Sequence, residues 1–67
     1  MNQPLYISLK HSESVIAAAA ANIYAAYIAS NRVVEGEEET WMRRSLEEAI
    51  WIALKADEKI RSDNELG

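Results

Sequence analysis

The sequence predicts an all-α fold, an antiparallel helical hairpin that assembles into a homo-oligomeric helical bundle. Residues 13–30 are mostly Ala, Ile and Tyr, with no Gly or Pro, which favours a helix. Residues 42–60 repeat apolar side chains at spacings of 4, 3, 4, 3 and 4, the seam pattern of a bundle helix. The seam residues are Met42, Leu46, Ala49, Ala53, Ala56 and Ile60. The third observation is that a chain of 67 residues without cysteine needs a stabilising partner.

The need for a partner follows from size and composition. Residues 1–67 form one domain, and below about 70 to 80 residues a single core seldom supplies more than a few kcal/mol. The usual supplements are disulfides, a structural metal or oligomerisation. The absence of cysteine excludes disulfides and thiolate metal sites, and His11 is the only histidine. Because 49% of the residues are hydrophobic, self-association is the expected supplement.

The N-terminal residues 1–11 are expected to form a short extended arm. Leu5, Ile7 and Leu9 alternate with polar or aromatic residues, which is the period of a strand. A single strand has no partner within the chain. If Leu5–Lys10 is ordered, we expect it to pair across a dimer axis or to lie along the helices.

The first helix is expected at about 13–30. Ser12 is suited to cap its N-terminus, and Glu13 then lies at the positive end of the helix dipole. Asn31 is suited to a left-handed terminating position. Val33, Val34 and Gly36 belong to the connection that follows.

The second helix is expected at about 37–61. Three consecutive glutamates, at 37–39, complement a helix N-terminus, while Lys59 and Arg61 complement its C-terminus. Residues 62–67 are polar and are expected to form a flexible tail. The short connection predicts that the two helices run antiparallel.

Both helices carry apolar residues on more than one side. The first has a ridge of small side chains at every fourth position and a second face of large ones, and Trp51 lies off the seam of the second helix. One neighbouring helix covers only one such face, so we expect a dimeric four-helix bundle, or else a tetramer. The predicted interface residues are Ala17, Ala21, Ala25, Ala29, Ile23, Ile28, Leu46, Ile50 and Trp51.

A ligand site is predicted around Arg43, Arg44 and Trp41. Guanidinium groups bind phosphate, and an indole stacks on a base. Asn22, Tyr24 and Tyr27 are further candidates for this site. The alternative interpretation is structural: both arginines lie four residues from glutamates, Asn22 fixes the register of the bundle, and the tyrosines belong to the core.

Charge and motif content exclude several classes of function. A formal charge of −4 and a pI near 4.8 disfavour binding to nucleic acid or anionic lipid. Residues 14–31 carry no charge over 18 positions, but their alanines and asparagines disfavour a membrane span. No constellation for catalysis, metal binding or a cofactor is evident. We therefore expect no enzyme activity and no cofactor, and without a secretory signal we expect a cytoplasmic protein.

Three functions remain compatible with these features. The first is a non-enzymatic homo-oligomeric interaction protein of the accessory or phage-like type, acting on a protein partner. The second is a protein that sequesters an anionic small molecule, such as a nucleotide, between subunits. The third is a regulator built like the ribbon-helix-helix DNA-binding dimers, which share the order strand, helix, helix. The acidic charge and the single strand cation, Lys10, count against the third.

Overall fold

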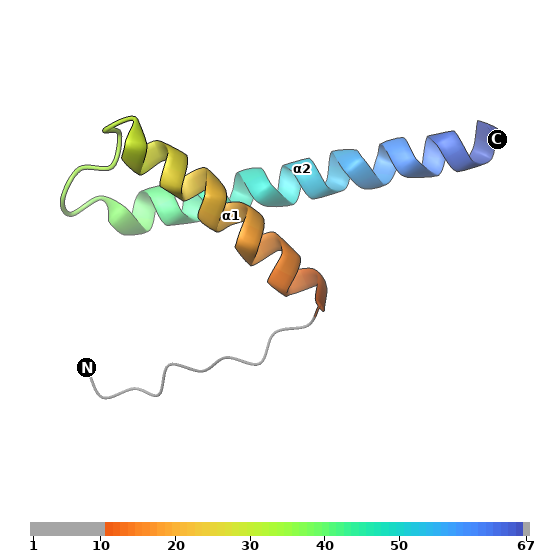
Figure 1. Ribbon diagram of the computed structural model, residues 1–67. Coiled ribbons are helices and arrows are strands. Elements are labelled where there is room, and N and C mark those ends of the chain that lie inside the picture. The colour runs from red at the N-terminus through yellow and green to blue at the C-terminus, as the bar shows by residue number, and fades with distance from the viewer. Residues whose placement is uncertain (1–10, 67) are drawn as a thin grey trace.

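The computed structural model describes the backbone of residues 11–66 and the side chains of residues 11–61. These residues form two helices, α1 (His11–Ala29) and α2 (Glu38–Leu66), and contain no strand (Figure 1). The all-helical, two-helix prediction is therefore confirmed for this part of the chain. The predicted extended segment Leu5–Lys10 lies outside the described residues.

Two predicted helix boundaries were wrong. Helix α1 begins at His11, so Ser12 lies within the helix instead of capping it. Helix α2 begins within one residue of the predicted start but continues to Leu66, past the predicted end at about Arg61. Polar residues alone do not end a helix, and residues 62–66 contain neither Gly nor Pro to break it.

The end of α1 confirms the prediction for Asn31. This residue adopts a left-handed conformation with φ of 62°. The Arg32 N–H donates to the Tyr27 carbonyl and the Asn31 N–H to the Ile28 carbonyl, both at 3.0 Å. These two bonds are those of the Schellman motif, which satisfies carbonyls that the end of a helix would leave unpaired.

The connection turns at Gly36, whose φ is 94°. The turn is closed by a hydrogen bond from the Glu37 N–H to the Val34 carbonyl at 2.9 Å. The Gly36 N–H donates to Glu38 Oε1 at 2.8 Å, and the Glu37 carbonyl accepts the first bond of α2 from Trp41 at 3.1 Å. These bonds hold the turn, and the chain reverses direction within a few residues.

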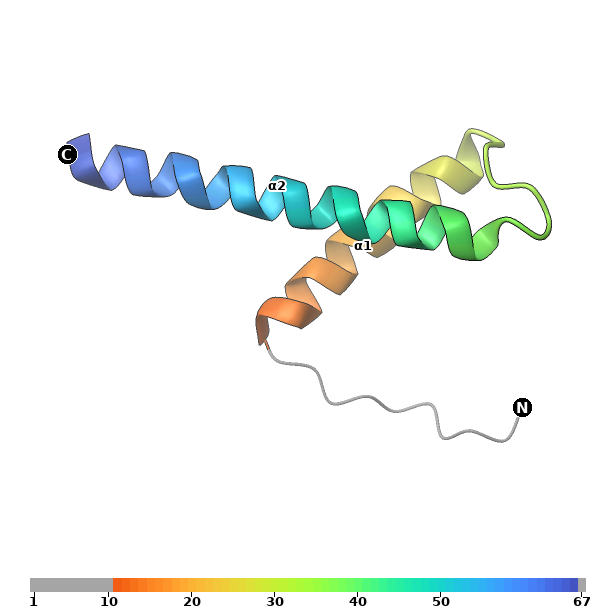
Figure 2. The same cartoon turned by 180° about the vertical axis from the view of Figure 1, so that it is seen from behind.

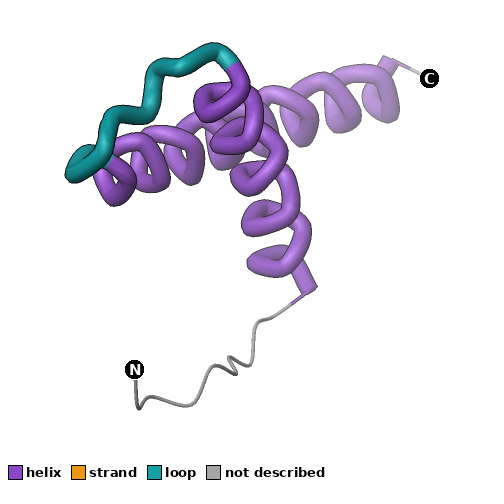
Figure 3. Tube along the Cα trace, turned by 60° about the vertical axis from the view of Figure 1, so that its left-hand side comes forward, coloured by secondary structure: helices purple, strands orange, loops and turns teal. Residues whose placement is uncertain are grey.

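The two helices cross obliquely and then diverge. Figures 1 and 2 show α1 passing across the first half of α2, while the second half of α2 extends beyond it. The view in Figure 3 shows the same oblique crossing from another side. The helices run in broadly opposite directions, as expected, and cross at an oblique angle.

Small side chains occupy the crossing. Among the described residues, those that are buried are Ala20, Ser45 and Ala49, with 5%, 1% and 2% of their surface exposed. Short side chains let the two backbones approach closely. Of the predicted seam of α2, Ala49 faces α1, whereas Met42 and Leu46 are exposed in the single chain.

The chain by itself is extended. Its radius of gyration is 15.3 Å, whereas a compact domain of this length would have about 11 Å. Every side chain from residue 50 to residue 61 is exposed. A single copy therefore leaves most of the apolar surface of α2 uncovered.

Candidate functional site

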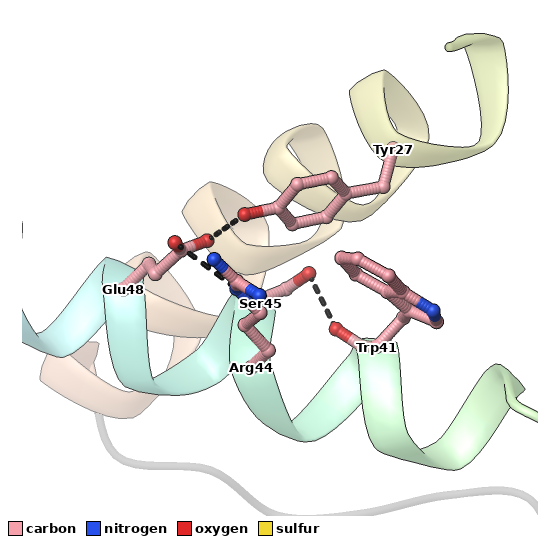
Figure 4. A network of polar contacts seen from close by, with 5 residues as sticks. All are labelled: Tyr27, Trp41, Arg44, Ser45 and Glu48. Carbon is pink, nitrogen blue, oxygen red and sulfur yellow. Dashed lines mark hydrogen bonds and ion pairs between the residues drawn. The ribbon is translucent and has the colours of Figure 1, made fainter. Parts of the chain in front are cut away.

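The main polar contact between the helices is a cluster of Tyr27, Trp41, Arg44 and Glu48, shown in Figure 4. Tyr27 Oη donates a hydrogen bond to Glu48 Oε1 at 2.5 Å, and Arg44 Nε lies 3.5 Å from Glu48 Oε2. One carboxylate thus uses one oxygen for a hydroxyl of α1 and the other for a guanidinium of α2. We call these four residues the Tyr27–Glu48 cluster.

Aromatic stacking completes the cluster. The rings of Tyr27 and Trp41 lie 4.7 Å apart between centroids, with 53° between their planes. The guanidinium carbon of Arg44 is 5.8 Å from the Tyr27 ring centroid and 5.4 Å from that of Trp41. These separations are typical of tilted aromatic pairs and cation–π contacts. The Arg44 side chain is therefore held by groups of its own chain.

The same contacts shift the pKa of Tyr27. The hydrogen bond to Glu48 raises the pKa of Tyr27 above its ordinary value of 10.0, and desolvation and the negative charge of Glu48 raise it further. The nearby Arg44 guanidinium partly opposes this rise, because a positive charge favours the phenolate. Tyr27 is consequently a neutral hydrogen-bond donor at neutral pH.

Ser45 lies at the crossing behind these rings. Its hydroxyl donates to the Trp41 carbonyl at 2.8 Å, so the buried side chain is satisfied within its own helix. Trp41 Nε1 in turn donates to Glu37 Oε1 at 3.4 Å, which joins the ring to the start of α2. The indole itself is positioned by this bond to Glu37 and by its contact with the Tyr27 ring.

The structure brings together only part of the predicted ligand site. Tyr27, Trp41 and Arg44 meet in the cluster, and Tyr24 is half-buried on α1. Arg43 lies on another face of α2, where it pairs with Glu39 at 3.5 Å. Asn22 is exposed on α1, about 160° around the helix from the buried Ala20.

Glu48 is the cluster residue that sequence reasoning did not include in the site. Its pairing with Arg44 was expected from their spacing of four residues. Its bond to Tyr27 joins positions 21 residues apart, and no local pattern signals such a contact.

An open groove lies beside the cluster. It has a volume of about 590 Å³ and is lined from both helices. Its lining residues are Ile23 of α1 and Arg44, Glu47, Glu48, Trp51 and Ile52 of α2. A smaller groove of about 270 Å³ continues past Trp51 along Leu54, Lys55 and Glu58. Trp51 therefore stands between two hollows, with 71% of its surface exposed.

No family model, curated protein or solved structure matches this chain. What it does is therefore inferred from its own surfaces. Within the described residues, neither helix has the length and apolar character needed to cross a membrane.

The predicted interface residues occupy several faces. Ile28, Leu46, Ile50 and Trp51 are exposed large apolar side chains. The alanines of the predicted ridge are exposed at 21, 25 and 29, whereas Ala17 and Ile23 are half-buried. The described residues thus present more than one apolar surface that α1 and α2 do not cover for each other.

Proposed function

We propose that this chain is a small, cytoplasmic, non-enzymatic interaction protein of the accessory or phage-like type, which self-associates and acts on a protein partner. The observation that carries the proposal is the exposure of large apolar side chains in the single chain. The most exposed of them are Trp51, Ile52 and Ile60, all on α2.

The energetic argument supports self-association. Full burial of a large apolar side chain contributes about 1.5 to 3 kcal/mol. The buried residues of the described part, Ala20, Ser45 and Ala49, are all small and supply little of this. A second copy that covered several exposed side chains would add stability that the contact between α1 and α2 does not supply.

The groove beside Trp51 is the proposed contact for the protein partner. Exposed tryptophans that can be buried in a partner are typical binding hot spots. Ile23 and Ile52 contribute apolar side chains to its lining, and Arg44 and Glu47 contribute charged ones.

Sedimentation velocity over a range of concentrations tests self-association. We expect an oligomer at micromolar concentration that dissociates on dilution. A folded chain that stays monomeric across this range would contradict the proposal.

The partner contact needs a separate test. A protein recovered with the intact oligomer should bind it directly when purified. The variant Trp51→Ala should weaken that binding by about tenfold or more. Val34→Ala changes a similarly exposed side chain in the connection and should leave binding unchanged. Equal effects of the two variants, or no recovered protein, would count against a partner at this groove.

Sequestration of an anionic small molecule is the weaker alternative. The groove contains two carboxylates, Glu47 and Glu48, and one guanidinium, Arg44, which is already paired. An anion would therefore meet net negative charge. Thermal shift against a nucleotide panel tests this alternative, since a ligand at a hundred times its Kd stabilises by about 2.7 kcal/mol.

A further inference from the structure

The face of α2 that points away from α1 carries a palindromic pattern. Seven residues on this face follow one another at intervals of 4, 3, 4, 4, 3 and 4. They are Glu39, Arg43, Leu46, Ile50, Leu54, Asp57 and Arg61. At about 100° per residue they lie within about 80° of one another around the helix. We call them the palindromic face.

Within the described part of the chain, all seven side chains of this face are exposed. The buried Ser45 and Ala49 lie about 140° and 100° around the helix from its centre. The face is centred on Ile50, with Leu46 and Leu54 four residues to either side. Its centre is therefore apolar, and its two ends are charged.

The charges are complementary to those of a second copy placed antiparallel. When two such helices meet about a two-fold axis at Ile50, each position faces the position equally far on the other side of Ile50. Glu39 then faces Arg61 of the second copy, and Arg43 faces Asp57. Leu46 faces Leu54, and Ile50 faces itself. Every charged pair across the contact is of opposite sign, and every central pair is apolar.

A parallel arrangement of the two helices would instead bring like charges together. Each charged residue would face its own copy, so Arg43 would meet Arg43 and Asp57 would meet Asp57. Like charges across an interface disfavour that arrangement. The charge pattern thus selects one orientation and one register.

The ion pairs within each chain fit the same arrangement. Arg43 pairs with Glu39 at 3.5 Å, and Arg61 pairs with Asp57 at 3.2 Å. In the antiparallel dimer the first pair would lie against the second pair of the other copy, giving four charges of alternating sign at each end. Networks of this kind are more favourable than isolated surface pairs, because the side chains are already held in place.

We propose that α2 pairs antiparallel with α2 of a second copy through the palindromic face, with Ile50 on the two-fold axis. This inference rests on the proposed self-association and specifies its surface, orientation and register. The contact runs from residue 39 to residue 61, about 33 Å of helix. It leaves Trp51 uncovered, about 100° around α2 from the centre of the face, whereas Leu54 of the face also lines the smaller groove.

Charge reversal tests the register. Arg43→Glu would place a carboxylate opposite that of Asp57, and Asp57→Arg would place two guanidinium groups opposite each other. Each variant alone is expected to raise the Kd of self-association at least about tenfold. An equimolar mixture of the two should form a heterodimer, because both cross-chain pairs are then of opposite sign. The double variant Arg43→Glu/Asp57→Arg should dimerise again.

Matched controls separate this effect from net charge. Lys55→Glu and Glu35→Arg make the same changes of charge, the first about 140° around α2 from the centre of the face and the second in the connection. They should alter the Kd little, and mixing them should give no gain. If they weaken dimerisation as much as the test variants, or if the Arg43 and Asp57 variants do not recover on mixing, the register is wrong.

Cross-linking gives a second readout that does not depend on charge. The chain has no cysteine, so Ile50→Cys introduces a single thiol, and two such thiols meet at the proposed axis. Oxidation should give a covalent dimer. Ile52→Cys, about 160° from the centre of the face, should not cross-link efficiently. Circular dichroism confirms that each variant is still helical.

The same experiments distinguish the palindromic contact from self-association through another surface. An oligomer that cross-links through position 52 and not position 50 would overturn the palindromic contact and leave self-association standing. A wild-type chain that is monomeric at all concentrations would overturn both.

Discussion

Glu48 shows how one side chain joins the two helices. Its carboxylate accepts the Tyr27 hydroxyl with one oxygen and pairs with Arg44 through the other. Arg44 also lies over the rings of Tyr27 and Trp41, so its positive charge already interacts with groups of its own chain. This arrangement favours the structural interpretation of Arg44 over a role in binding an anion.

The raised pKa of Tyr27 leads to a prediction about pH. Because the folded-state pKa lies above the ordinary value of 10.0, the hydrogen bond to Glu48 contributes stability below pH 10.0. That contribution is lost as the pH rises through the folded-state pKa. An ultraviolet titration should show one tyrosine ionising later than the others.

Two tyrosine variants check the assignment. Tyr27→Phe should remove the late-ionising group and flatten the alkaline loss of stability. Tyr24→Phe removes a half-buried tyrosine of the same helix and should leave the late group in place. A late group that survives in Tyr27→Phe would show that another tyrosine carries the shift.

At the scale of the elements, the sequence predicted the presence of two helices and the termination of α1 better than it predicted the other boundaries or the packing. Local signals sufficed for the termination at Asn31, which needs only a residue that tolerates a left-handed conformation. The apolar period identified α2 as a helix but did not identify which side meets α1. That side is set by the small residues Ala20, Ser45 and Ala49, where the backbones approach each other. Contacts between residues distant in sequence, such as Tyr27 with Glu48, depend on this crossing and have no local signature.

The close approach of the two helices at their crossing predicts that a larger side chain there destabilises the fold. Ala49→Leu would place a large side chain where 2% of the alanine surface is exposed, and should destabilise the fold by about 1 to 3 kcal/mol. Ala56→Leu changes the same residue type two turns later on the same side of α2, where α1 has diverged and the alanine is exposed. Its effect should stay within about 0.5 kcal/mol in urea denaturation. Similar losses for both would mean that α1 follows α2 further than the structure has it.

The turn gives a second prediction at this scale. Gly36 has a positive φ of 94°, and a Cβ placed there would have no neighbour within 4 Å. Gly36→Ala should therefore cost about 1 to 2 kcal/mol through backbone strain alone. Glu35→Ala, in the same turn, should have a much smaller effect. An unchanged stability in Gly36→Ala would show that the turn adopts another conformation in solution.

At the scale of the whole molecule, the single chain is too open to hold its own apolar surface. The radius of gyration of 15.3 Å and the exposed second half of α2 describe a single chain whose apolar surface is largely uncovered. The sequence predicted this from residue types alone, because two helices with several apolar faces cannot cover one another. It gave no orientation for the assembly, since the pairing of charges becomes evident only when the side of α2 that faces α1 is known.

Because the single chain leaves so much apolar surface exposed, we expect its thermal stability to depend on protein concentration. If folding is coupled to dimerisation, each tenfold rise in protein concentration adds about 1.4 kcal/mol per mole of dimer. With about 2.1 cal/mol/K of unfolding entropy per residue, a dimer of this chain should gain about 5 °C in Tm per tenfold rise. Circular dichroism melts over a hundredfold range would resolve this. Ile50→Asp, which places two carboxylates at the proposed axis, should lower the Tm at every concentration. A wild-type Tm that does not change with concentration would show that the open hairpin is stable as a single chain.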